Sequence, residues 1–254
     1  MQISPKLAQM SLYRTTLRPF ICRRLASKLI NVHTCQDYLD FCRENGTALD
    51  GPVCRGTLYE LTVKNILEKS FHCFNLVRSG GAGDNGLDIF GRWNLGMFHD
   101  PQNASTKIPR LSLLSLCKPY FDRKTAIDIE NDIVMLVQCK NYKLKIAAAT
   151  VRELAGIREF HINMRLKADK MKTFMMLVSP LPMTKQGQRQ MDTSDVPMLH
   201  MQVSPLLPPK VPGPDDFCIE NWSGGIVGPV YMNHMSRLVL QGFSVERELS
   251  QVVR

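Results

Sequence analysis

A short stretch in the first half of the chain places a carboxylate where a strand would present it. Residues 87–91 read LDIFG, a run of residues that favours a strand. Successive side chains of a strand point to opposite faces, so Asp88 and Phe90 are predicted on one face, with Leu87 and Ile89 on the other. Asp88 is therefore a candidate for chemistry at the face or edge of a sheet.

A second stretch, residues 133–142, repeats this pattern in the sequence IVMLVQCKNY. The same two-residue period places Gln138 and Lys140 on one face of a strand. Burying an unpaired amide costs about 2–7 kcal/mol, and an unpaired ammonium costs more. We therefore expect Asp88, on a neighbouring strand, to be the partner of these two side chains.

An acid, an amide and a lysine at one edge of a sheet are typical of metal-dependent phosphodiester hydrolysis. Mg²⁺ prefers hard oxygen ligands, which Asp88, the backbone carbonyl of Cys139 and Glu60 can supply. The ion would polarise a phosphodiester oxygen and acidify a bound water. Lys140 would then orient the attacking water and stabilise charge on the phosphorus.

The glycines before Asp88 suggest a different chemistry. Residues 81–86 read GAGDNG, which matches the G-x-G-x-x-G spacing of dinucleotide-binding loops. That loop must open a helix whose N-terminus faces the pyrophosphate, whereas here a β-type run follows Gly86. The glycines are therefore predicted to form a turn that positions Asp88, with Asp84 as a turn residue.

The elements that would position these residues begin with a helix over 55–71, which carries Glu60 at the edge of its apolar stripe. Strands are predicted at 74–78, 87–91 and 133–142. Thr150 and Glu153 have capping-box spacing before a further apolar stripe, Leu154 to Met171, and this predicts a second helix.

The uninterrupted apolar run at 174–178, FMMLV, is typical of a strand that is buried on both faces. Together with the preceding strand and helix it predicts a parallel βαβ unit. A further strand is predicted at 197–203.

At this point the motifs can be compared with a known family. GGAGDNGLDIFG, followed by VQCKNYKLKIAAATVRELAGI, resembles the Mrr-type branch of the PD-(D/E)xK nucleases over about residues 55–180. With the basic N-terminus and the YELTVKNIL helix, the whole chain resembles the fungal mitochondrial family called required for respiratory growth protein 7.

The resemblance implies a fold and a set of roles. The fold is α/β, a restriction endonuclease-like core (αβββαβ) with a central mixed sheet flanked by helices. Asp88 would bind the metal, Gln138 would be the second ligand or an orienting amide, Lys140 the catalytic lysine, and Glu60 the accessory acid of the first helix. Gln138 stands where the broader superfamily has Glu, which removes one negative charge from the site.

Basic residues beyond the Q-x-K strand could contact phosphates. Lys143, Lys145 and Arg152 are the candidates, with a solvated charged face as the alternative. Trp93 and Tyr142 could stack on bases or could fill gaps in a core.

The net charge of +9 is concentrated at the N-terminus. Residues 1–30 hold six Lys and Arg and no Asp or Glu, which is typical of a mitochondrial transit peptide, with a disordered basic tail as the alternative. The eight cysteines show neither C-x-x-C nor zinc spacing, so reduced thiols are expected. No stretch of 18 apolar residues predicts a membrane span.

The chain is thus expected to have five segments. These are a mitochondrial transit peptide (1–30), a linker or short helix (31–54), an Mrr-like nuclease-fold domain (55–204) with an insertion (92–132), a Pro-rich linker (205–216), and a C-terminal Gly-rich and helical segment (217–254).

The expected function is that of a Mg²⁺-dependent (or Mn²⁺-dependent) endonuclease of the mitochondrial matrix that hydrolyses mitochondrial DNA. The alternative is a DNA-binding or structural factor with little turnover. A homodimer is compatible with either function.

Overall fold

The computed structural model of the chain describes residues 32–79, 85–98, 130–163, 170–210, 214–240 and 243–252. The chain divides into two units, Met1–His33 and Thr34–Arg254, and all the helices and strands below belong to the second. The predicted transit peptide lies outside the described residues. So do the first part of the glycine loop and most of the 92–132 insertion.

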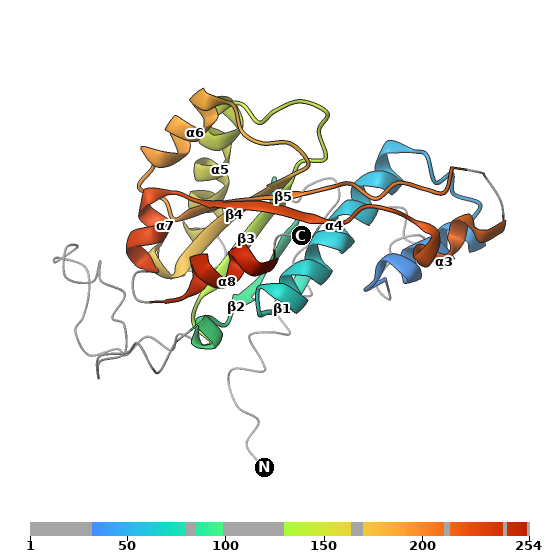
Figure 1. The fold of residues 1–254 in the computed structure, drawn as a ribbon, viewed down its shortest axis with the longest axis horizontal. Helices are drawn as coiled ribbons and strands as arrows, with labels where there is room; N and C mark the ends of the chain where they lie inside the picture. The colour runs from blue at the N-terminus through green and yellow to red at the C-terminus, as the bar shows by residue number, and fades with distance from the viewer. Residues whose placement is uncertain are drawn as a thin grey trace, which may run out of the picture. The chain divides into compact units, whose positions relative to one another are not determined.

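Two helices open the second unit (Figure 1). Helix α3, Cys35–Glu44, occupies the segment predicted as a linker or short helix, and Thr34 and Asp37 close a capping box at its start. Helix α4, Pro52–Ser70, confirms the helix predicted at 55–71. Pro52 stands in its first turn, where an intrahelical N–H partner is not required.

The centre of this unit is a six-stranded sheet with the order β1-β2-β3-β4-β5-β6. Its strands are β1 (Cys73–Arg78), β2 (Ile89–Trp93), β3 (Val134–Cys139), β4 (Thr173–Ser179), β5 (Met198–Val203) and β6 (Val227–Met232). The β3–β4 and β4–β5 pairs are parallel and the other three are antiparallel. The predicted mixed sheet flanked by helices is therefore confirmed.

Helix α5, Ala148–His161, connects the parallel strands β3 and β4, as the predicted βαβ unit requires. Its N-cap is Ala147, and no side chain caps it. The capping box predicted at Thr150 and Glu153 is wrong, because the helix begins earlier and Thr150 already lies within its first turn. Helix α6, Lys185–Asp192, connects β4 to β5.

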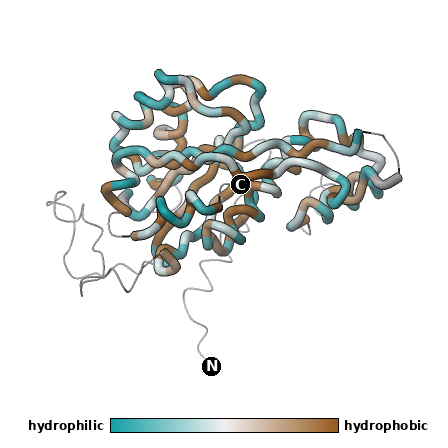
Figure 2. The backbone as a smooth tube through the Cα atoms, viewed as in Figure 1, coloured by the Kyte–Doolittle hydropathy of each residue, from teal (hydrophilic) through white to brown (hydrophobic). Residues whose placement is uncertain are grey.

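The sheet has a hydrophobic core on each face. One core joins α4 to the sheet and also includes residues of α7 (His234–Val239) and α8 (Val245–Val252), and the other lies under α5 and α6. Figure 2 shows hydrophobic residues along the central strands. Short 3-10 helices complete the fold at η2 (Leu95–Phe98), η5 (Lys170–Lys172), η6 (Pro214–Phe217) and η7 (Ile219–Asn221).

One prediction about β2 is wrong. Ile89 belongs to the core on the α4 side, whereas Leu87 belongs to the core on the α5 side. Leu87 and Ile89 therefore do not share a face. The reason is that β2 begins at Ile89, directly after a turn in which Asn85 and Gly86 both have positive φ, so strand alternation does not extend back to Leu87.

The C-terminal segment returns to the same sheet. Leu207, in the Pro-rich segment, forms an antiparallel bridge with Ser223, and β6 then pairs with β5. Gly224 has φ +106°, and a Cβ there would lie 2.1 Å from the Pro205 carbonyl oxygen, so this turn requires glycine. Within the described part of the chain, no helix has the length and apolarity needed to cross a membrane.

Candidate functional site

Asp88 lies one residue before β2 and is held by the backbone on both sides. Its N–H donates to the Val137 carbonyl at 3.0 Å, and its own carbonyl accepts from the Ser79 N–H at 2.8 Å. Its side-chain Oδ2 accepts a 2.6 Å hydrogen bond from the Cys139 N–H. The carboxylate is therefore fixed where β3 ends, although Asp88 itself is outside the strand predicted to contain it.

Glu60 projects from α4 and is paired with a residue that the sequence did not single out. Arg78, the last residue of β1, places its Nη1 2.9 Å from Glu60 Oε2, and each side chain is only 17% exposed. The signal for Arg78 was weak: it is a lone cation at the end of an apolar run. Its charge offsets that of Glu60.

The thiol of Cys139 is affected by the charged groups of the predicted site. Burial raises its pKa well above the ordinary 9.0, the nearby charges of Asp88 and Glu60 raise it further, and the Lys140 ammonium acts in the opposite direction. The thiol is therefore protonated at neutral pH. Asp88 is bonded to the Cys139 N–H and Lys140 follows Cys139, so both lie at the end of β3.

Gln138 is directed to the other side of the sheet. Val137 and Cys139 contact the core on the α4 side, so strand alternation turns Gln138 towards α5. In agreement with this, a Cβ on Gly86 would lie 3.3 Å from Gln138 Nε2 and 2.6 Å from Ile157 of α5. Gln138 is 2% exposed, and its Oε1 has no hydrogen-bond partner.

Lys140 leaves the end of β3, where its N–H donates to the Val178 carbonyl at 2.8 Å. Its Nζ lies 5.7 Å from the centroid of the Tyr142 ring, within the range of a cation–π contact. The expected pairing with Asp88 is not found, because the salt bridges of the described residues include none from Lys140. Asp88 bonds to the neighbouring backbone N–H instead.

The basic residues predicted to contact phosphates lie on the surface. Lys143, Lys145 and Arg152 are exposed, and Arg152 donates a 3.2 Å hydrogen bond to Gln190. Tyr142 is also exposed. Trp93, in contrast, is completely buried against Phe98 and Phe174, so it belongs to the core and cannot stack on a base.

The arrangement fits a divalent cation in part. Asp88 and Glu60 carry hard carboxylate oxygens, the kind of ligand that Mg²⁺ prefers, and both raise the pKa of the Cys139 thiol. Gln138 Oε1, an unsatisfied acceptor, lies on the α5 side, and Arg78 neutralises part of the charge. In the described residues, no group of three or more His, Cys, Asp and Glu side chains is arranged to hold a metal.

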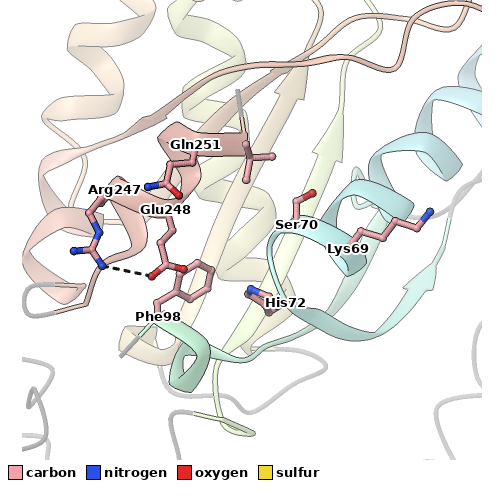
Figure 3. A pocket seen from close by; sticks show the side chains of 8 residues that line it. Lys69, Ser70, His72, Phe98, Arg247, Glu248 and Gln251 are labelled. Carbon is pink, nitrogen blue, oxygen red and sulfur yellow. Dashed lines mark ion pairs between the residues drawn. The ribbon is translucent and has the colours of Figure 1, made fainter. Parts of the chain in front are cut away.

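A hollow of about 510 Å³ lies elsewhere, between the end of α4, η2 and α8 (Figure 3). Arg247, Glu248 and His72 are among the residues that line it. No residue of the predicted site lines it.

Comparisons with known proteins point to one family. The family model described as required for respiratory growth protein 7 matches residues 52–240. The chain is 32% identical over 222 residues to the Candida glabrata protein named "Required for respiratory growth protein 7, mitochondrial", covering 83% of this chain and 84% of that protein.

Two other proteins with the same name are also similar. The Vanderwaltozyma polyspora protein is 30% identical over 65% of this chain and 68% of its own length. The Zygosaccharomyces rouxii protein is 27% identical over 92% of this chain and 93% of its own length. No solved structure matches the chain.

Proposed function

The chain belongs to the required for respiratory growth protein 7 family, and from this premise we propose that it is a metal-dependent endonuclease acting on DNA in the mitochondrial matrix. It is a mitochondrial protein needed for respiratory growth, as the names of its relatives state. The nuclease activity and the DNA substrate are our proposal, and they are argued from the residues at the end of β3.

One observation carries the proposal. Asp88 Oδ2 accepts a 2.6 Å hydrogen bond from the Cys139 N–H, and Lys140, the next residue, is held by the Val178 carbonyl, so an acid and a lysine from separate segments meet at the end of β3. Glu60 of α4 is the second acid whose charge raises the pKa of the Cys139 thiol there. Gathering two acids and a lysine at the edge of a sheet costs desolvation free energy, and fold stability alone does not require it. Such gathering is typical of sites that perform acid–base or metal-assisted chemistry.

Each residue would have a defined role. A bound Mg²⁺ would polarise the phosphodiester and acidify water. Asp88, with Oδ2 fixed by the Cys139 N–H, and Glu60, oriented by Arg78, would hold that ion. Lys140 would orient the attacking water and stabilise the negative charge that develops on the phosphate oxygens.

The order of the elements supports an Mrr-type, restriction endonuclease-like core. Along the chain, α4, β1, β2, β3, α5 and β4 follow one another as αβββαβ. Asp88 comes directly before the second strand, and the Q-x-K motif ends the third. Strands β5 and β6 then extend the sheet beyond this core.

A second candidate function is that of a nuclease-fold DNA-binding factor with little turnover. The ion pair between Arg78 and Glu60 favours it, because a carboxylate already engaged at 2.9 Å has less charge to offer a cation. The position of Gln138 on the α5 side favours it as well, since it separates the amide from Glu60.

A plasmid-cleavage assay distinguishes the two functions. The full chain is incubated with supercoiled plasmid and Mg²⁺ or Mn²⁺, with EDTA as a negative control. We expect nicking or linearisation that Asp88→Asn and Lys140→Ala each reduce at least about a hundredfold, the usual scale for such groups.

The matched controls are Asp195→Asn and Lys210→Ala, two exposed residues outside the site, which should leave cleavage unchanged. Cleavage that persists in both site variants would show that the site is misassigned. An intact plasmid that is retarded on a gel would favour the binding factor.

A further inference from the structure

The segment that follows the Q-x-K strand holds two apolar side chains out in solvent. Tyr142 is 50% exposed and Leu144 is 78% exposed. Both lie in the loop from Lys140 to Ile146, which we call the KNYKLKI loop. Its remaining basic residues, Lys143 and Lys145, are also exposed, so cationic and apolar side chains alternate along it.

The KNYKLKI loop is anchored at both ends. At its start, the Lys140 N–H donates to the Val178 carbonyl at 2.8 Å, and the Tyr142 N–H donates to the Lys140 carbonyl at 2.7 Å. At its end, Ile146 is buried and pairs with Met183 in a β-bridge. The exposed side chains are therefore presented from fixed backbone, which lowers the entropic cost of binding a partner.

The anchor at Ile146 depends on a glycine and adds a further cation. A Cβ on Gly187, in the first turn of α6, would lie 2.8 Å from the Ile146 carbonyl oxygen, so only glycine lets the helix approach the loop this closely. Thr184, the N-cap of α6, donates to the same carbonyl at 2.9 Å. The exposed Lys185 comes next in the sequence and extends the basic surface beside the loop.

We infer that the KNYKLKI loop binds unpaired nucleotides, so that the preferred substrate of the site is single-stranded nucleic acid or a strand end rather than intact duplex. The inference rests on the proposed function and names its substrate class. An exposed tyrosine ring can stack on a base, and a leucine beside it can pack against that base, only where the base is unpaired. Lys143, between them, and Lys145, directly after Leu144, are exposed cations that can neutralise backbone phosphates.

An anionic membrane surface is the competing partner, because it also attracts exposed apolar and cationic residues. Peripheral membrane binding generally uses the long apolar face of an amphipathic helix. Here the apolar surface is limited to two side chains on a short loop. This loop also leaves β3 directly beside the residue whose N–H binds Asp88, which favours a substrate of the proposed site.

Binding can be measured with the full chain in Ca²⁺ or EDTA, to prevent hydrolysis, using fluorescence anisotropy. The probes are a labelled single-stranded DNA, an RNA of the same sequence and the matching DNA duplex. We expect single strands to bind more tightly than the duplex. The double variant Tyr142→Ala/Leu144→Ser should lose about tenfold in single-strand affinity, the value of roughly one stacked base.

The same variant should change duplex affinity less than about twofold, because the duplex offers only phosphates to the loop. The double variant Lys143→Ala/Lys145→Ala should lower the affinity for the single strands and for the duplex alike, and should reduce the salt dependence of that affinity. Leu207→Ser, at an exposed leucine on the segment that pairs with Ser223, is the matched control and should change neither. Unaltered thermal unfolding of each variant confirms that it is folded.

Three results would overturn the inference: equal losses for duplex and single strand in the Tyr142/Leu144 variant, a wild-type preference for duplex, or no binding to any of the three probes. Loop-dependent binding to phosphatidylserine vesicles without nucleic-acid binding would assign the loop to a membrane instead. A loop-dependent preference for single strands without cleavage would contradict only the nuclease activity. Cleavage of duplex without that preference would contradict only the inference about the loop.

Discussion

Two polar clusters of the same sheet differ in charge and in how fully their hydrogen bonds are made. The rim cluster, at the end of β3, consists of Glu60, Arg78, Asp88 and Cys139. The β5 cluster, around the strand of that name, consists of Ser179, His200, Asn233 and Ser236.

The β5 cluster is made of buried neutral groups. The amide of Asn233 forms four hydrogen bonds, accepting from the N–H groups of Met198 and Ser236 and donating to the carbonyls of Met191 and Val196. The Oγ of Ser179 lies 2.8 Å from His200 Nε2. Polar groups arranged in this way serve the fold, because each buried donor or acceptor has a partner.

The rim cluster is made of charges that water still reaches, and Gln138 Oε1, in the same strand end, has no partner. A fold gains little from such an arrangement, since partly exposed ion pairs contribute little and an unsatisfied buried acceptor costs free energy. The difference teaches that function is better sought at the rim cluster than at the more completely buried His and Ser of the β5 cluster. Four predictions test this distinction.

The largest effect on stability is expected from Asn233→Ala. The change leaves several buried backbone groups without partners, each at a cost of about 1–3 kcal/mol, so the free energy of unfolding should fall by about 4 kcal/mol. Urea denaturation measures it. Asn163→Ala, on an exposed amide bonded to Glu159, is the control and should cost far less. If Asn233→Ala lowered the free energy of unfolding by less than about 1 kcal/mol, the β5 cluster would not be a major source of stability.

Lowering the pH should destabilise the β5 cluster next most strongly. Burial lowers the pKa of His200 to about 4 from 6.5, so below pH 6.5 the unfolded chain takes up a proton that the folded chain does not. Stability from this group is complete above pH 6.5 and should fall by about 3 kcal/mol as the pH approaches 4.

This pH dependence can be assigned by comparing variants. Urea denaturation across the range should show a flatter curve for His200→Gln, whereas the exposed His234→Gln should retain the wild-type slope. If the free energy of unfolding fell equally steeply with pH in wild type and in His200→Gln, a group other than His200 would cause the pH dependence.

Substitution of Asp88 should separate stability from activity. Asp88→Ala leaves the Cys139 N–H without its acceptor and should cost about 2 kcal/mol, whereas Asn can still accept that hydrogen bond and should cost under about 1 kcal/mol. Under the proposed function, both variants lose cleavage. If Asp88→Asn were as active as wild type, the rim cluster would be structural like the β5 cluster.

The smallest effect is expected from Arg78→Gln. The Arg78–Glu60 pair is partly exposed, so its loss should cost about 1 kcal/mol or less. Lys64→Gln, which breaks the i,i+4 pair with Glu68, provides a reference for a partly exposed ion pair within one helix. If Arg78 orients Glu60 for a cation, Arg78→Gln should change the Mg²⁺ concentration needed for half-maximal cleavage, whereas Lys64→Gln should not.

The sequence predicted the parts of the fold in which local pattern and tertiary packing agree. Helix α4 and strands β1, β3, β4 and β5 lie close to where apolar periodicity placed them, and β2 begins two residues later than predicted. The convergence of Asp88, Glu60 and Lys140 on one metal ion stays a prediction. The direction of Gln138 and the engagement of Glu60 by Arg78 could not be predicted. Both depend on where a strand begins and on contacts between residues distant in sequence.

Two other features were missed because local signals were misleading. The sequence of β6, VGPVYM, contains Gly and Pro, which argue against a strand, yet an edge strand tolerates proline where its N–H is not needed. The true capping box is at Thr34 and Asp37, whereas the matching spacing at Thr150 lies inside a helix whose start is fixed by the Ile146 bridge.

Pro229 in β6 also limits the association of copies of this protein at high concentration. Both outer strands of the sheet interrupt their own pairing pattern: β6 carries Pro229, and β1 shifts register between Phe74 and Val77 with Asn75 at φ +52°. An uninterrupted outer strand would be a template for intermolecular β-pairing. Replacing Pro229 with a β-branched residue would therefore be expected to promote aggregation.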